Sequence, residues 1–256
     1  EKMQAFGRLL DVLDELREKC PWDHKQTNES LRPNTIEETY ELCDALVKDD
    51  VNEICKELGD VLLHVCFYAK IGSEKEQFDI ADVCNRLCDK LIFRHHHVYG
   101  DAVANNAGDV VKTWEQIKLK EKGGNKTVLS GVPDALPALI KAYRVQDKAR
   151  NVGFDWDKKE DVWEKVREEL AELEVELNRG DEEKSTAEFG DFLFSLINAG
   201  RLYHLNPENA LEYTNQKFIR RFNYVEDQTL KQGRQLADMT LAEMDLLWQE
   251  AKEKLG

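Results

Sequence analysis

The sequence predicts an all-α fold, and three observations lead to this prediction. Apolar residues recur at the helical spacing i, i+3, i+4, i+7 along most of the chain, beginning with Phe6, Leu9, Leu10 and Leu13. The alternation of apolar and polar residues that marks strands is absent from the sequence. Several Asn, Thr or Asp residues stand three positions before a Glu, which is the pattern of a capping box at a helix start. These pairs are Asn34 and Glu37, Thr35 and Glu38, Asp161 and Glu164, and Thr240 and Glu243.

The same signals place the helices in order along the chain. The opening periodic run predicts the first helix, and the capping patterns at Asn34 and Thr35 predict where the second begins. Pro137 and Pro207 suit the first turn of two later helices. The helices at 51–71 and 182–204 are apolar nearly all round and are expected to be buried. The expected helices cover residues 3–19, 35–48, 51–71, 79–97, 109–121, 137–150, 161–178, 182–204, 207–226 and 240–254.

A break in the helical pattern divides the chain nearly in half. Residues 123–133 lack periodicity and contain three glycines and a proline, so they are predicted to form a linker. The linker separates a first module, residues 1–122, from a second module, residues 134–256. We expect each module to be a helical bundle.

The two halves repeat one acidic motif. Glu-Glu-x-x-Glu at 37–41 recurs at 168–172, and Glu-x-x-Asp at 57–60 recurs at 188–191. Both parts of the motif recur at one and the same offset along the chain, so that position 37 corresponds to 168 and position 57 to 188. A repeat of this length indicates two tandem copies of one long module rather than a short solenoid repeat.

Residue spacing predicts that four carboxylates of the first module meet. Glu38 and Glu41 lie one helical turn apart, as do Glu57 and Asp60. Residue 49 is the midpoint of 41 and 57 and also of 38 and 60. A hairpin that turns at Asp49 therefore places Glu41 opposite Glu57 and Glu38 opposite Asp60.

The second module repeats this register around Gly180, and glycine is the residue that most often ends a helix. Its four acids are Glu169, Glu172, Glu188 and Asp191. Partly buried carboxylates that converge repel one another and lose hydration unless cations neutralise them. Ligands that are all oxygen favour Mg²⁺ or Mn²⁺ over zinc or copper. A solvated acidic helix face is the alternative for either half alone, and the repeated register favours the metal site.

Composition excludes several classes of partner. The net charge of -15 disfavours binding to nucleic acid and to anionic membranes. No apolar run approaches the roughly 18 residues of a membrane span. The segment from Glu1 to Cys20 is a charged amphipathic pattern rather than a signal peptide, so we expect a cytoplasmic protein.

Other possible ligand groups are less promising. The six cysteines form no Cys-x-x-Cys pair and are expected to be reduced thiols packed as small apolar side chains. Only Cys84 and Cys88, one helical turn apart, are placed to share a metal. The run of three histidines at 95–97 fits a surface cluster at a helix end better than a metal site.

The acidic motifs resemble those of the MazG-type nucleoside triphosphate pyrophosphohydrolases, whose signature is E-E-x-x-E followed by E-x-x-D. Both modules match the signature, and the resemblance spans nearly the whole chain. It implies an all-α fold, Mg²⁺ dependence and hydrolysis of nucleoside triphosphates to monophosphate and pyrophosphate. It also implies homodimers in which helices from two subunits complete each bundle. Further matching segments lie at residues 20–23, 114–118, 151–156 and 217–222.

The resemblance also implies roles for particular residues. It implies that the four acids of each hairpin bind the metal. As a separate hypothesis we expect one acid, Glu172 or its neighbour Glu169, to act as the general base, and the sequence does not decide between a base and a pure metal ligand. Basic side chains would neutralise the triphosphate and Trp248 would stack on a base, although ordinary surface charges and a core tryptophan are the alternatives. The nucleotide-binding positions are Lys165, Glu168, Lys184, Lys217, Arg220, Arg221 and Trp248.

The same residues bear on two further questions, namely which module is active and which other class of protein the sequence would fit. We expect the second module to carry the activity, because it has the fuller basic set and the first departs from it at the three histidines. A carboxylate-bridged iron or manganese oxidase is disfavoured because such sites use Glu-x-x-His, whereas both motifs here are Glu-x-x-Asp. A non-enzymatic acidic scaffold remains the other alternative, and the base or sugar that is preferred stays open.

Overall fold

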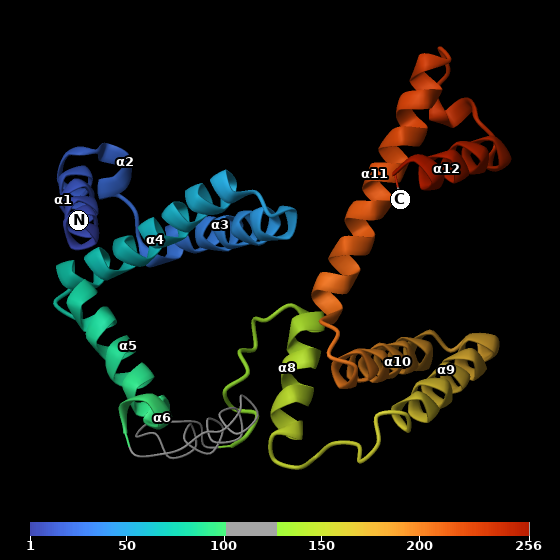
Figure 1. Ribbon diagram of the computed structural model, residues 1–256, viewed down its shortest axis with the longest axis horizontal. Coiled ribbons are helices and arrows are strands. Elements are labelled where there is room, and N and C mark those ends of the chain that lie inside the picture. Colours follow the sequence, from blue (N-terminus) through green and yellow to red (C-terminus); the bar gives the residue numbers. More distant parts are fainter. Residues whose placement is uncertain (101–126, 256) are drawn as a thin grey trace. The chain divides into compact units, whose positions relative to one another are not determined.

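The computed structural model describes residues 1–100 and 127–255, and every regular element in these ranges is a helix (Figure 1). The all-α prediction is confirmed. The chain divides into two compact units, residues 1–105 and 106–256. The boundary between them, the expected helix at 109–121 and the first residues of the expected linker lie outside the described residues. None of the described helices combines the length and apolar character that a membrane crossing requires.

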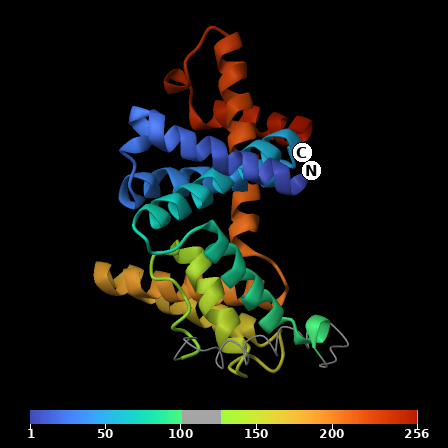
Figure 2. The same cartoon turned by 90° about the vertical axis from the view of Figure 1, so that its left-hand side faces the viewer.

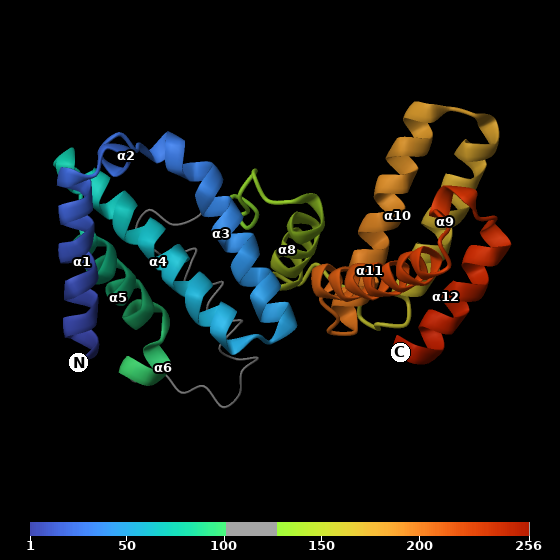
Figure 3. The ribbon, with the colours of Figure 1, turned by 90° about the horizontal axis from the view of Figure 1, so that it is seen from above.

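The first unit is built around a hairpin of two long helices. Helices α3 and α4 pack along each other, and α1 and α5 pack against α4 (Figure 3). Leu13 of α1 and Leu31 of α3 form a core with Cys66, Phe67 and Ile71 of α4. The helices are α1 (Lys2–Lys19), α2 (Pro21–His24), α3 (Asn28–Lys48), α4 (Val51–Glu74), α5 (Ile80–Arg94) and α6 (His96–Tyr99).

The second unit contains a hairpin of the same kind. Helices α9 and α10 pack together around Val162, Val166 and Ala199, and α8 contacts both α10 and α11. Helix α11, drawn in orange, packs against α12, drawn in red (Figure 2). The elements are α8 (Ala138–Arg150), α9 (Val162–Arg179), α10 (Glu182–Leu202), α11 (Pro207–Lys231), the short 3₁₀ helix η1 (Leu236–Asp238) and α12 (Leu241–Leu255).

Helix α3 begins earlier than the sequence analysis predicted. Thr27 and Ser30 form a reciprocal capping box in which each side chain accepts a hydrogen bond from the other residue's backbone N–H. The predicted caps at Asn34 and Thr35 are therefore wrong, because both residues lie inside the helix. The Thr27 pair was overlooked because serine, not glutamate, provides the reciprocal acceptor.

The other predicted helix starts have mixed outcomes. Thr240 and Glu243 form the expected capping box at α12, with the Thr240 N–H donating to the Glu243 carboxylate at 2.8 Å. Asp161 precedes α9, but its side chain makes no capping hydrogen bond. Pro207 opens α11 as predicted, whereas Pro137 lies one residue before α8.

Two predictions about helix length and burial are corrected. The expected helix at 79–97 breaks at His95, whose ring Nδ1 lies 2.6 Å from the Leu91 carbonyl oxygen. Helices α4 and α10 are not buried all round, because each leaves apolar side chains in solvent in the isolated chain. The exposed residues are Val51, Leu58, Leu62 and Val65 on α4, and Phe189, Leu193, Phe194 and Leu196 on α10.

The cysteine prediction is also partly wrong. Only Cys66 is a buried thiol, and Cys20 is half-buried. Cys43, Cys55, Cys84 and Cys88 are exposed, because they fall on the outer faces of their helices.

Candidate functional site

Each hairpin turns at the residue that the acidic spacing predicts. Asp49 ends α3 in the left-handed conformation, with a φ of 54°, and Gly180 ends α9 in the same conformation, with a φ of 74°. The next residue caps the following helix in both cases. Asp50 accepts a hydrogen bond from the Asn52 N–H, and Asp181 accepts one from the Lys184 N–H. Both connections thus consist of a stop residue followed directly by a start residue.

This turn brings glutamates of the facing helices together. Glu38, Glu41 and Glu57 each present a carboxylate oxygen within 4.8 Å of the other two. In the second hairpin, Glu169, Glu172 and Glu188 do the same. We call these groups the first and the second glutamate triad. Three of the four acids predicted for each hairpin therefore converge.

The fourth acid of each hairpin, Asp60 or Asp191, lies outside its triad but close enough to act on it electrostatically. Burial, followed by the charge of Asp60, raises the pKa of Glu38 above its usual value. Burial, followed by the charges of Glu172 and Asp191, likewise raises the pKa of Glu188. Crowded negative charge is therefore common to both sites.

The first triad has the chemistry of a divalent-cation site. Glu57 is only 3% exposed, and its Oε2 has no hydrogen-bond partner among the described residues. Its Oε1 accepts a hydrogen bond from Lys56 Nζ at 2.6 Å. A buried carboxylate oxygen without a partner is costly, and a hard cation with oxygen ligands would satisfy it.

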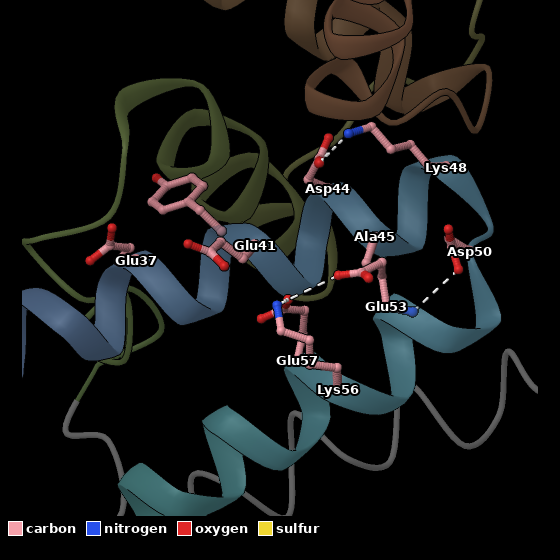
Figure 4. A pocket seen from close by; sticks show the side chains of 10 residues that line it. Glu37, Glu41, Asp44, Ala45, Lys48, Asp50, Glu53, Lys56 and Glu57 are labelled. Carbon is pink, nitrogen blue, oxygen red and sulfur yellow. Dashed lines mark hydrogen bonds and ion pairs between the residues drawn. The ribbon is translucent and has the colours of Figure 1, made fainter.

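A hollow of about 620 Å³ lies beside the first triad. Glu41 and Glu57 face it from opposite helices, and Ala45 lines it on the side of the turn (Figure 4). Two lysines also line this hollow: Lys48, which pairs with Asp44, and Lys56, which pairs with Glu57.

The second hollow is smaller, at about 370 Å³, and has a different lining. Glu176, which the sequence analysis did not select, contributes to it together with two members of the triad. The offset between the two acidic motifs pairs Glu176 with Ala45, so comparing the two repeats position by position would have revealed it. The lining residues are Glu168, Ala171, Glu172, Val175, Glu176 and Glu188.

The residues expected to bind nucleotide fall into two groups. Lys165 lies at the second triad, with its Nζ 2.9 Å from a carboxylate oxygen of Glu168 and 2.8 Å from one of Glu169. Lys184 lies near the turn and pairs with Asp181 at 3.2 Å. These residues share the α9–α10 hairpin with the carboxylates.

The remaining expected residues lie on the other helix pair of the second unit. Lys217, Arg220 and Arg221 belong to α11, and Trp248 belongs to α12. The Trp248 ring packs against Phe218, with 5.0 Å between ring centroids. The described residues that line the second hollow all come from α9 and α10, so this group is not part of that lining.

The alternative metal ligands do not assemble. Within residues 1–100 and 127–255, the groups of acid, thiol or imidazole side chains with metal-ligand spacing are the two glutamate triads. The exposed pair Cys84 and Cys88 and the histidines at 95–97 belong to neither triad.

Fold and site together define an all-helical protein with two carboxylate centres on matching hairpins. Residues 26–99, which include the first hairpin, match the model of the MazG nucleotide pyrophosphohydrolase domain. The chain is 39% identical to a nucleoside triphosphate pyrophosphohydrolase of Escherichia coli strain K12, over 98% of both proteins. It is 42% identical to nucleoside triphosphate pyrophosphohydrolase/pyrophosphatase MazG of Thermotoga maritima, over 96% of this chain and 95% of that protein. It is also 46% identical to the Bacillus subtilis protein YabN, over 97% of this chain and 52% of the relative. The chain belongs to the MazG nucleotide pyrophosphohydrolase family.

Proposed function

We propose that the protein hydrolyses nucleoside triphosphates to nucleoside monophosphate and pyrophosphate, with Mg²⁺ held by the hairpin carboxylates and Mn²⁺ able to replace it. The observation that carries the proposal is the convergence of three glutamates within 4.8 Å in each hairpin. The similarity to relatives named nucleoside triphosphate pyrophosphohydrolase, which extends over nearly the whole chain, supports this substrate class.

In the second hairpin, Glu169, Glu172, Glu188 and Asp191 would hold the metal. When bound, a divalent ion offsets the charge of the triphosphate and makes the attacking water more acidic. Glu172 is the better placed of the two candidate bases, because it is exposed at the hollow. Glu169 is buried, pairs with Lys165 Nζ at 2.8 Å and is not among the described residues that line the hollow.

Local basic groups must compensate for the strongly negative chain when a polyphosphate binds. Lys165 and Lys184 lie on the α9–α10 hairpin, and we assign them to the phosphates. Arg220 on α11 serves the same purpose together with Lys217 and Arg221, and Trp248 stacks on the base.

A homodimer explains the apolar side chains that α4 and α10 leave exposed. Leu58 is 52% exposed and Phe189 is 51% exposed, and both residues stand next to a member of a glutamate triad. Exposed apolar patches on helices suit burial against another subunit. We infer that a second copy of the chain covers these faces and completes each bundle.

The second module is our candidate for the working site. In the first hairpin Lys56 pairs with Glu57 of the triad, and Ala187 occupies the corresponding position in the second hairpin. Glu188 therefore faces the hollow without a lysine from the preceding residue, and its charge remains available to a metal. The absence of histidine from both triads also argues against an iron oxidase.

The test is a panel of nucleoside triphosphates incubated with the purified chain and Mg²⁺. We expect monophosphate and pyrophosphate in equal amounts, and no turnover after chelation of the metal. Release of inorganic phosphate in place of pyrophosphate, or turnover that is independent of divalent metal, would contradict the proposal. An acidic scaffold without enzymatic activity would show no turnover with any triphosphate.

A further inference from the structure

One carboxylate at the second hollow has no counterpart in the first. Glu176 lies one helical turn beyond Glu172 on α9, and the offset between the repeats pairs it with Ala45. Ala45 is 4% exposed and Glu176 is 9% exposed, so both residues lie in the interior of their hairpins. The hairpin fold is therefore compatible with alanine at this position.

Glu176 shares the hollow with two members of the second triad, Glu172 and Glu188. One oxygen of Glu176 accepts a hydrogen bond from Arg179. The other, Oε2, is buried and has no hydrogen-bond partner in the described part of the chain. Half of this carboxylate is thus unsatisfied at the edge of a site that is already rich in negative charge.

An unsatisfied buried carboxylate destabilises a fold unless something binds to it. The two hollows differ in how their charge is compensated. Lys48 and Lys56 line the first hollow. The described residues that line the second include no basic side chain, and Lys165 and Arg179 pair with its carboxylates Glu168 and Glu176 from outside the lining. A hard cation satisfies such oxygens, and adjacent metal ions are common where phosphate chains are cleaved.

We propose that Glu176 is a metal ligand, and that with Glu172 and Glu188 it allows the second hairpin to hold one divalent cation more than the first. The proposal rests on the proposed function, because it extends the metal centre assigned there. It explains why a buried glutamate stands where the sister hairpin has alanine.

The experiment counts Mn²⁺ bound to the full-length protein without nucleotide, by calorimetric titration and by electron paramagnetic resonance of the free ion. We expect Glu176→Ala and Glu176→Gln to bind one Mn²⁺ fewer per chain than the unmodified protein. The glutamine variant keeps a hydrogen-bond acceptor for Arg179, and the alanine variant copies the first hairpin. Circular dichroism of both variants should show unchanged helix content.

Arg179→Ala is the matched control, because it removes the ion pair and leaves the carboxylate in place. If Glu176 is a ligand, this variant keeps the full number of Mn²⁺ ions. The inference is overturned if both Glu176 variants bind as many ions as the unmodified protein. It is also overturned if Arg179→Ala loses the same ion, because Glu176 would then act through its ion pair. If the unmodified protein binds no Mn²⁺, the proposed function fails as well.

Discussion

The two hairpins bring the same three glutamates together but bury a different one. In the first hairpin the buried member is Glu57 on α4, and in the second it is Glu169 on α9. Each buried glutamate has a lysine partner: Lys56 for Glu57 and Lys165 for Glu169. The motif spacing therefore determines which carboxylates meet, whereas residues outside the motif determine which of them stays free.

The hairpins also differ in the layer below the triad, by which we mean the residues next to it on the side away from the hairpin turn. In the first, the Thr35 hydroxyl oxygen lies 2.9 Å from His64 Nδ1 and 2.6 Å from the Tyr68 hydroxyl. At the corresponding positions of the repeat, the second hairpin has Val166, Ser195 and Ala199. One triad thus rests on a hydrogen-bonded network and the other on a mainly apolar layer.

The largest expected effect is the loss of activity on removal of Glu172. We expect Glu172→Ala to lower kcat for pyrophosphate release by about 1000-fold, equivalent to about 4 kcal/mol, because it removes both a metal ligand and the proposed base. The matched change in the first hairpin, Glu41→Ala, should lower kcat by less than about tenfold. Steady-state kinetics with a saturating triphosphate would measure both.

This pair of variants also tests the choice of module. Equal losses in the two variants would show that both hairpins work. Unchanged turnover in the double variant would contradict the whole mechanism.

A smaller effect is expected from exchanging the lysine that distinguishes the triads. Lys56→Ala frees Glu57 from its ion pair, so we expect about tenfold tighter Mn²⁺ binding at the first hairpin. Ala187→Lys places a lysine beside Glu188 and should weaken binding at the second hairpin by a similar factor. Calorimetric titration measures both affinities. If neither affinity changes, the lysine does not account for the difference between the sites.

The network below the first triad should make that hairpin sensitive to mild acid. Burial lowers the pKa of His64 below its usual value. The unfolded chain therefore gains a proton near the usual histidine pKa of about 6.5 that the folded His64 resists, and the free energy of unfolding should fall as the pH drops from about 7.5 to about 5.5. Hydrogen exchange measured on α4 and α10 peptides should show this loss in α4 only.

His64→Ser is the control, because serine occupies the equivalent position in the second hairpin. This variant should reduce the dependence of hydrogen-exchange protection in α4 on pH. A change in protection at the upper end of the pH range does not affect the test. An unchanged slope would show that another group causes the sensitivity.

The sequence predicted the features that depend on local spacing and left out those that depend on packing. The turns at Asp49 and Gly180 followed from the motif midpoints, because an antiparallel hairpin pairs residues symmetrically about its turn. The partner of Glu57 did not follow, because pairing with Lys56 requires a particular side-chain conformation. Glu176 was missed because a motif search passes over positions that differ between repeats.

Exposure was the hardest property to predict. Helical periodicity identifies the apolar stripe of α10, but it cannot tell whether another chain covers that stripe. Phe189 and Phe194 lie on the helix that was expected to be buried, and both are exposed in the isolated chain. The relation of Trp248 to the carboxylates is similarly a matter of tertiary packing, which residue spacing on α12 does not encode.

The smallest expected effect concerns the two turns, which have the same conformation but different residues. At Gly180 an added Cβ would meet no atom within 4 Å, so Gly180→Ala tests the backbone alone. A left-handed φ of 74° should make this variant about 1 kcal/mol less stable towards unfolding. Asp49→Gly should change stability by less than about 0.5 kcal/mol, because two effects offset each other. Glycine relieves the backbone strain at a φ of 54°, but it also has greater conformational freedom in the unfolded chain. Denaturant unfolding followed by hydrogen exchange in each hairpin measures both effects, and equal responses would show that side-chain contacts rather than backbone conformation stabilise the turns.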